Sequence, residues 1–178
     1  MKDKSTNPVH QELTSLLHDH APSAQLFEHP ECKTSEESME ARHKASGERV
    51  TGAKALLVKL DVRDQPDLFA VIVLPGFNKL DSKAMKKELK ERVPGFRSFR
   101  FASPEEMEQK ARGMQPGKMP PFGHPLFPDI TYTFIDESLA AHDKIGFNAA
   151  DFESSFIMST REYLQLVEHD GVLLCSIE

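Results

Sequence analysis

The chain has 178 residues and a formal net charge of −6 at pH 7, and 39% of its residues are hydrophobic. This length is enough for one domain with a substantial core, so we expect a single domain over residues 1–178. No apolar run approaches the roughly 20 residues that cross a bilayer, and the N-terminus lacks the apolar stretch of a secretory signal. We therefore expect a cytoplasmic protein without a membrane partner, and the acidic balance also argues against DNA as a partner.

The cysteines and histidines give no metal-binding pattern. Cys32 and Cys175 lie far apart and belong to no CxxC motif, which disfavours both a disulfide framework and a structural zinc site. His18 and His20 form an HxH pair at an expected helix end, without a neighbouring cysteine or carboxylate cluster. We predict no metal and no cofactor.

The first third of the chain predicts two helices and two strands. Apolar residues recur at helical spacing over residues 9–17. The sequence TSEE is a capping box that predicts a second helix from Thr34, with Gly47 as its stop. Ala53–Asp61 and Leu68–Pro75 are apolar runs joined by a polar turn, and we expect both to be buried strands.

The next segments predict a helix, a strand and a short helix. Asp81 can cap a helix through about Arg92, and Phe96–Phe101 mixes aromatic and polar residues as a half-buried strand does. Ser103 begins a second capping box, with proline at the first helical position, and Gly113 is the expected end of that helix.

Short strand-like segments fill the rest of the chain. A helix capped by Ser159 or Thr160 and carrying Tyr163, Leu164 and Val167 precedes the last of them. Strands and helices are intermixed without a regular strand–helix–strand alternation, which predicts an α+β fold with a mixed sheet. The predicted strands here are Ile130–Asp136, Lys144–Ala150, Ser154–Thr160 and Val172–Ile177.

A basic segment lies in the middle of this acidic chain. Lys79–Arg100 holds eight lysines and arginines against three acidic residues. Two interpretations stay open: a solvated helix face, or a local surface that contacts phosphates.

The stretch Arg112–Phe127 has three glycines and four prolines in sixteen residues. Prolines fix φ and remove amide donors, so its backbone is stiff and few N–H groups remain, while Gly117 permits close approach of another molecule. The Gly117–Pro121 frame, a GxxxP, could cradle a carbonyl or oxyanion through main-chain amides. The alternative is an ordered turn that only covers the core. We call residues 112–127 the Gly/Pro segment.

The usual catalytic motifs are absent: the sequence contains no GxSxG, no GxxxxGK[ST] and no GxGxxG after a strand. Ser154 and Ser155 have no matched base, so a catalytic triad is not supported. Whether His124 or His142 takes part stays open. The absence of these motifs favours a reaction that needs no side-chain nucleophile.

The sequence FASPEEMEQKARGMQPGKMPPFG (Phe101–Gly123) resembles the signature of the YbaK family, the free-standing aminoacyl-tRNA deacylases related to the editing insertion of bacterial prolyl-tRNA synthetases. Four other segments occur in the order that the family has: TGAKALLVK and LDSKAMKKEL before this stretch, and FIDESL and IGFNAADFE after it. The resemblance covers about residues 26–166, with residues 1–25 as an N-terminal helical extension. It implies a mixed sheet flanked by helices.

The resemblance also implies an activity, the hydrolysis of the ester between a wrong amino acid and the 3′ end of a tRNA, most plausibly tRNA-Pro. Lys54 matches the family lysine associated with the terminal nucleotide, and Gly117–Pro121 matches the loop associated with the aminoacyl carbonyl. Aminoacyl-tRNA is then the substrate, and prolyl-tRNA synthetase is a candidate partner. The predicted catalytic residues are Lys54, Gly117, Lys118, Met119, Pro120 and Pro121.

Two further groups of residues follow from this prediction. The expected substrate-binding residues are Gly113, Met114, Phe122, Gly123, Asp136, Phe147 and Asn148. The expected tRNA contacts are Lys83, Lys86, Lys87 and Lys90. Two rival functions remain: a catalytically silent module that binds tRNA or a synthetase, and a hydrolase of a non-tRNA ester or amide.

Overall fold

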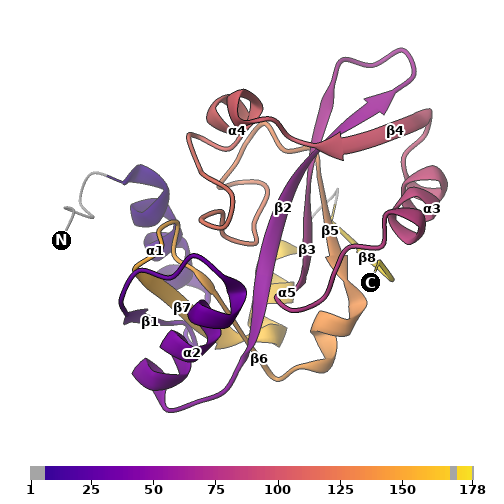
Figure 1. Ribbon diagram of the computed structural model, residues 1–178. Helices are drawn as coiled ribbons and strands as arrows, with labels where there is room; N and C mark the ends of the chain where they lie inside the picture. Colours follow the sequence, from indigo (N-terminus) through magenta and orange to yellow (C-terminus); the bar gives the residue numbers. More distant parts are fainter. Residues whose placement is uncertain (1–6, 169–171, 178) are drawn as a thin grey trace.

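The computed structural model describes residues 7–168 and 172–177. Helices and strands alternate irregularly along this part of the chain (Figure 1). The helices are α1 (Pro8–His20), α2 (Ser35–Ser46), α3 (Ser82–Arg92), α4 (Pro104–Lys110), the 3-10 helix η2 (Glu137–Ala141) and α5 (Thr160–Val167). The strands are β1 (Gln25–Glu28), β2 (Thr51–Val62), β3 (Leu68–Pro75), β4 (Phe96–Phe101), β5 (Tyr132–Asp136), β6 (Lys144–Asn148), β7 (Ser154–Ser159) and β8 (Val172–Cys175).

The described strands form one mixed sheet in the order β1-β7-β6-β2-β3-β5-β8, with β4 paired to the far half of β2. The β1–β7, β7–β6, β2–β3 and β2–β4 pairs are antiparallel, whereas β2–β6, β3–β5 and β5–β8 are parallel. The predicted α+β fold with a mixed sheet is therefore confirmed.

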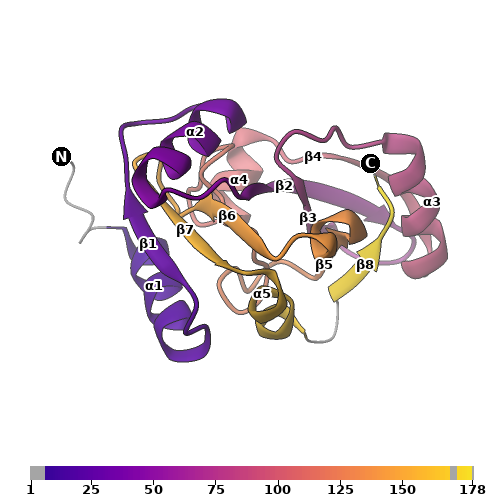
Figure 2. The same ribbon diagram turned by 90° about the horizontal axis from the view of Figure 1, so that it is seen from below.

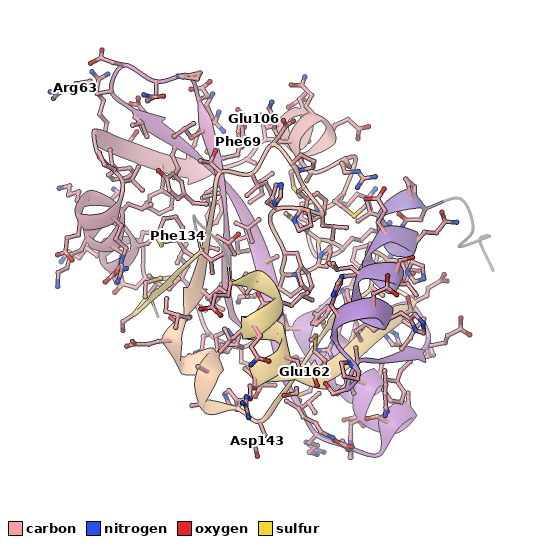
Figure 3. The ribbon with its side chains drawn as sticks, turned by 180° about the vertical axis from the view of Figure 1, so that it is seen from behind. Arg63, Phe69, Glu106, Phe134, Asp143 and Glu162 are labelled. Carbon is pink, nitrogen blue, oxygen red and sulfur yellow. The ribbon has the colours of Figure 1, made fainter. Side chains whose placement is uncertain are left out.

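Helices cover both faces of this sheet. Helices α2 and α3 lie on one face, and α1 and α5 lie on the other (Figure 2). Each face has its own apolar core: Phe69 belongs to the core under α1, α4 and α5, and Phe134 to the core under α3 (Figure 3). The long strand β2 contributes to both cores, because successive side chains of a strand point to opposite faces. Leu57 faces the first core and Val58 the second.

One edge of β2 changes partners along its length, and this change makes room for a site. Strand β6 pairs with β2 only at Thr51 and Gly52, and β4 pairs with it from Val58 onward. Between these ladders, that edge of β2 has no strand partner within the described chain. The residues of this stretch are therefore accessible to the Gly/Pro segment and to α2.

Local signals predicted most elements, but several ends differ. Strand β2 is longer than the predicted Ala53–Asp61, β5 begins at Tyr132 instead of Ile130, and β6, β7 and β8 end one or two residues before their predicted ends. Both capping boxes form, at Thr34 and at Ser103, and Gly47 closes α2 with φ +78°. Helix α4 ends at Lys110 instead of Gly113, because Gly113 lies in the next turn with φ +76° and its N–H bonds to the carbonyl of Glu108.

Two elements, β1 and η2, were not predicted. Strand β1 is four residues long and mostly exposed, and its hydrogen bonds come from β7, over 120 residues away. Such a strand carries no local hydrophobic pattern, so only the tertiary pairing reveals it.

Candidate active site

A small cavity of about 90 Å³ lies beside the unpaired stretch of β2. Its wall is built from the start of α2, the first half of β2, the turn after β3, the Gly/Pro segment and the end of β6. The structure thus brings together five residues that the sequence predicted, from segments far apart in the chain. The predicted residues at the cavity are Lys54, Gly117, Met119, Phe147 and Asn148.

Lys54 lies on β2, at the wall of the cavity. Its ammonium donates one hydrogen bond of 3.1 Å to the carbonyl of Gly76 and a second to the carbonyl of Asn78. Partial burial lowers the pKa of Lys54. Within residues 7–168 and 172–177 the ammonium has no carboxylate partner, so one N–H and the full positive charge are available to a ligand.

Several amides of the Gly/Pro segment have no acceptor in the described chain, and those of Gly117 and Met119 belong to residues that line the cavity. The N–H of Lys118 bonds to the carbonyl of Gln115 at 3.0 Å, but the N–H groups of Gly117 and Met119 on either side donate to nothing there. Gly117 has φ +84°, a conformation that favours glycine. Both residues line the cavity, so this turn has the donors that an oxyanion requires.

Contacts from two elements, β6 and α5, fix the Gly/Pro segment in place. The side-chain amide of Asn148 donates to the carbonyl of Gly117 at 2.7 Å. The buried hydroxyl of Tyr163 donates to the carbonyl of Pro121 at 2.5 Å, and burial raises the pKa of Tyr163. The Phe122 ring packs edge-on against the rings of Phe147 and Tyr163, with centroids 5.6 and 5.4 Å away.

The remaining predicted catalytic residues support this turn. The Lys118 ammonium lies 4.8 Å from the centroid of the Phe152 ring, a cation–π contact outside the cavity wall. The same ring would be 3.3 Å from a Cβ added at Gly117, so the turn packs closely against it. Pro120 and Pro121 are buried. These two buried prolines therefore support the turn.

Several predicted substrate-binding residues lie away from the cavity. Met114 and Phe122 belong to the core under α1, α4 and α5, and Gly113 forms the turn after α4. Gly123 is packed so closely that an added Cβ would be 2.5 Å from the hydroxyl of Thr133. These positions shape the segment without lining the cavity wall.

Asp136, predicted to bind substrate, is buried where β5 ends. Its carboxylate accepts the N–H of Ser138 at 2.9 Å and the N–H of Ile177 at 3.0 Å. Both bonds are structural, since one caps η2 and the other holds the end of the chain after β8. Asp136 does not line the cavity.

The four lysines predicted to contact tRNA are exposed on α3. Met85 and Leu89 bury the opposite face of this helix against the sheet. In the described part of the chain none of the four lysines forms an ion pair, in contrast to Arg92, which lies 2.7 Å from Glu88. The helix therefore presents an exposed basic surface made of Lys83, Lys86, Lys87 and Lys90.

The histidines left open by the sequence are not in the cavity wall. His142 shares a hydrogen bond of 3.0 Å with the hydroxyl of Thr51, and His124 lies in the Gly/Pro segment. His18 and His20 lie in the last turn of α1. In the described residues, no group of three histidine, cysteine or acidic side chains is arranged to hold a metal ion.

Sequence reasoning missed Arg42 and Phe77, which both line the cavity. Arg42 lies on α2 and is only 4% exposed, although arginine is normally a surface residue. Phe77 is 52% exposed in the turn after β3, next to the carbonyls that hold Lys54. An isolated arginine in a helix and an isolated phenylalanine in a turn give no sequence signal, so only the fold identifies them.

Comparisons with known proteins identify the family of this chain. The family described as the aminoacyl-tRNA editing domain matches residues 29–166. A curated relative, the multifunctional Ser/Thr-tRNA deacylase ProXp-y of Escherichia coli (strain K12), is 28% identical over 165 residues, which are 92% of this chain and 91% of the relative.

Solved structures share the fold. The crystal structure of a protein named "putative trans-editing enzyme for prolyl tRNA synthetase" is 20% identical, has a TM-score of 0.70, and aligns with 97% of this chain and 98% of its own. A second crystal structure, of a hypothetical protein, is 18% identical with a TM-score of 0.68, over 93% of this chain and 98% of its own.

The chain therefore belongs to the aminoacyl-tRNA editing domain family, as its motifs predicted. It is an aminoacyl-tRNA deacylase, a hydrolase of the ester that joins an amino acid to tRNA. Within the described residues, no helix is long and apolar enough to span a membrane.

Proposed function

We propose that this deacylase removes small non-cognate amino acids from tRNA in the cavity beside β2, by means of main-chain amides and one lysine. The observation that carries the proposal is the pair of unsatisfied amides, at Gly117 and Met119, beside the Lys54 ammonium in one small cavity. An aminoacyl ester is already activated, so the protein needs chiefly to position water and to stabilise the tetrahedral oxyanion.

In the proposed reaction, water attacks the ester carbonyl and the negative charge develops on its oxygen. The amides of Gly117 and Met119 donate to that oxygen. The bond to the ribose oxygen then breaks, and the proton released by water moves to the leaving hydroxyl through a neighbouring tRNA hydroxyl or the substrate itself. Loss of one oxyanion donor typically lowers the rate about 10²–10³-fold, so two backbone donors can carry much of the catalysis.

Lys54 and the lysines of α3 would bind the tRNA. The Lys54 ammonium, held by two carbonyls, suits the phosphate of the terminal nucleotide. Exposed Phe77 at the cavity wall offers a ring on which the terminal base can stack. The basic surface of α3 would contact phosphates further along the acceptor end.

We propose serine and threonine as the amino acids removed, with tRNA-Pro carrying a small amino acid as the second substrate to test. The E. coli relative is named a Ser/Thr-tRNA deacylase, and the cavity wall combines apolar Met39 and Met119 with polar Ser38 and Asn148. A wall of this kind suits a short side chain with a hydroxyl. Such a substrate exists where translation occurs, which agrees with a cytoplasmic protein, and a prolyl-tRNA synthetase partner would supply tRNA-Pro.

The test is the release of free amino acid from a panel of tRNAs: Ser-tRNA and Thr-tRNA on non-cognate acceptors, Ala-tRNA-Pro, and correctly charged Pro-tRNA-Pro. We expect hydrolysis of at least one mischarged member and none of Pro-tRNA-Pro. A catalytically silent binding module would bind the panel without release, and a hydrolase of other esters would ignore it while cleaving a simple activated ester.

Variants at Lys54 separate the mechanism from the fold. Lys54→Ala should lower kcat/KM for the mischarged tRNA by at least about tenfold, since a charged hydrogen bond is lost, with an unchanged circular dichroism spectrum. Lys59→Ala is the matched control, because Lys59 lies on the same strand but pairs with Asp67 and Glu106. Full activity in Lys54→Ala would remove this lysine from the mechanism.

A further inference from the structure

Arg42 is a buried charge without a carboxylate partner. Its side chain is 4% exposed, and burial lowers its pKa to about 10, so it stays protonated at neutral pH. Its Nη1 donates a long bond of 3.4 Å to the hydroxyl of Ser155, and its buried Nε has no partner. Its Nη2 donates to no acceptor in the described chain and is not among the fully buried unpartnered atoms, and Arg42 is one of the residues that line the cavity.

The sheet is shaped to receive this guanidinium. Gly52 of β2 and Gly146 of β6 are register partners in the parallel ladder. A Cβ added at Gly52 would be 3.0 Å from Nη2 of Arg42, and one added at Gly146 would be 2.8 Å from its Cδ and 2.9 Å from its Nε. A pair of glycines facing each other across two strands thus forms the slot that holds the arginine.

Three cationic side chains line this cavity, and of these Lys33 is paired with Glu31 at 3.7 Å, whereas Arg42 and Lys54 have no carboxylate partner in the described chain. Residues two apart on a strand share a face, so Lys54 lies about 7 Å along β2 from Gly52 and on the side that Arg42 covers. Lys33 is the third cation in the wall, and the wall contains no acidic residue, although the chain as a whole carries a charge of −6.

The first turn of α2 adds to the positive electrostatic potential at the cavity. Thr34 and Ser35 line the cavity, and the N–H groups of Ser35 and Glu36 have no acceptor in the described chain. Amides at a helix N-terminus attract anions. The Glu37 carboxylate accepts the N–H groups of Lys33 and Thr34, so the amides of Ser35 and Glu36, with Nη2 of Arg42, are the donors left for a ligand here.

We propose that Arg42, Lys54 and the first turn of α2 form a phosphate subsite, which holds the phosphate of the terminal nucleotide during editing. An unpaired buried charge destabilises the free protein, and an incoming phosphate is the group that can satisfy both Arg42 and Lys54. This subsite rests on the proposed function, because the phosphate it receives belongs to the tRNA being deacylated.

The competing role for Arg42 is to position the Gly/Pro segment. Ser155 also donates to the side-chain oxygen of Asn148 at 3.4 Å, and Asn148 bonds to Gly117. The bonds that join Ser155 to Arg42 and to Asn148 are both long, and the short bond of its hydroxyl, 2.8 Å, is with Nε2 of His29, so the link from Arg42 to the turn is weak. Positioning would need Ser155, whereas phosphate binding would not.

The test compares adenosine 5′-monophosphate with adenosine as ligands of the full chain, by calorimetry or NMR titration. The wild type should bind the monophosphate more tightly, and the preference should shrink with added salt. Arg42→Met should reduce that preference about tenfold to a hundredfold, as expected for loss of a charge-assisted hydrogen bond. Arg42→Lys should retain part of it. Arg161→Met, at an exposed arginine of α5, is the matched control and should retain all of it.

Thermal unfolding and Ser155→Ala decide between the two roles. If Arg42 serves to bind a phosphate, the Arg42→Met variant should unfold at the same or a higher temperature than the wild type. In that case the Ser155→Ala variant should keep the preference for the monophosphate. Equal affinity of the wild type for adenosine and its monophosphate, or loss of the preference in Ser155→Ala, would overturn the subsite.

These outcomes are independent of the deacylation panel. Release of amino acid by a wild type that does not prefer the monophosphate would leave the proposed function standing and remove the subsite. A clear preference for the monophosphate without release from any mischarged tRNA would leave the subsite standing and remove the proposed function.

Discussion

The side-chain amide of Asn148 donates a hydrogen bond of 2.7 Å to the carbonyl oxygen of Gly117, which lies 31 residues earlier in the chain. Asn148 is the last residue of β6, so this bond fixes the turn of the Gly/Pro segment against the sheet. The Gly117 carbonyl shares a peptide plane with the N–H of Lys118, which bonds to Gln115, so the bond from Asn148 fixes the peptide that lies between the amides of Gly117 and Met119.

Asn148→Ala should lower kcat between about threefold and a hundredfold, because the bond is lost and the amides of the turn are less well positioned. Asn148→Asp should be more damaging at nearly equal volume, since a carboxylate cannot donate to the Gly117 carbonyl and repels it. Single-turnover deacylation of a mischarged tRNA measures this effect. Equal rates for the two variants and the wild type would contradict the assigned role of this bond.

Phe77→Ala should weaken the binding of tRNA. Stacking of a base on an aromatic side chain contributes about 1–3 kcal/mol, so we expect KM to rise roughly fivefold to a hundredfold. Phe77→Leu is the control that keeps an apolar side chain but removes the ring, and it should resemble Phe77→Ala. If Phe77→Leu matches the wild type, the residue acts through hydrophobic contact and not through stacking.

Charge reversal on α3 should weaken tRNA binding and reduce its dependence on salt. The triple variant Lys86→Glu, Lys87→Glu, Lys90→Glu should lower kcat/KM, and the slope of log affinity against log salt should fall by about 0.7–0.9 for each tRNA phosphate that the helix no longer neutralises. Reversal of Lys44 and Lys144, which pair with Glu40 and Glu48, is the control at other surfaces.

An unchanged slope in the α3 variant would show that this helix face is only solvated. The rate at saturating tRNA should stay near that of the wild type, because the four lysines of α3 are not in the cavity wall.

Tyr163→Phe should lower the free energy of unfolding and should have little effect on the rate of deacylation. The variant leaves the buried carbonyl of Pro121 without its donor, and an unsatisfied buried group costs about 1–3 kcal/mol. Urea unfolding followed by circular dichroism measures the loss. Tyr132→Phe is the control at the half-buried start of β5, and should unfold close to the wild type. A Tyr163→Phe variant as stable as the wild type would mean that water replaces the hydroxyl.

Glu106 should make stability depend on acid pH. Two hydrogen bonds of 2.7 Å from Arg100, with further bonds from the Ser103 amide and Lys59, hold the pKa of Glu106 at about 2 (Figure 3 labels Glu106). Because the folded-state pKa is depressed, this contribution to stability is complete above the ordinary glutamate pKa and is lost as pH falls toward 2. The wild type should exceed Glu106→Gln in melting temperature at neutral pH, and the gap should narrow between pH 4.5 and 2.

Glu108→Gln, an exposed substitution on the same helix, should show a much smaller gap at every pH. A constant difference between the wild type and Glu106→Gln across this range would mean that ionisation of Glu106 does not support the contact between β4 and α4.

The sequence determined most local elements and a minority of the residues at the cavity, five of the sixteen that line it. Capping boxes at Thr34 and Ser103, period-2 runs and the glycines and prolines of residues 112–127 act within a few residues, so their outcome can be read from neighbouring letters. The same motifs indicated Lys54 and the Gly117–Pro121 turn.

Tertiary structure decided which of these residues meet. The Gly52–Gly146 slot that holds Arg42 depends on the parallel pairing of β2 with β6, which joins segments over 90 residues apart, and the position of Phe77 depends on the antiparallel pairing of β2 with β3. Asp136 is the opposite case, a residue that the sequence indicated and the fold places elsewhere. Its place in a motif predicted substrate binding, whereas in the fold its carboxylate accepts the N–H groups of Ser138 and Ile177. Long-range pairing and the burial of charge depend on the whole chain, and short sequence patterns carry no information about either.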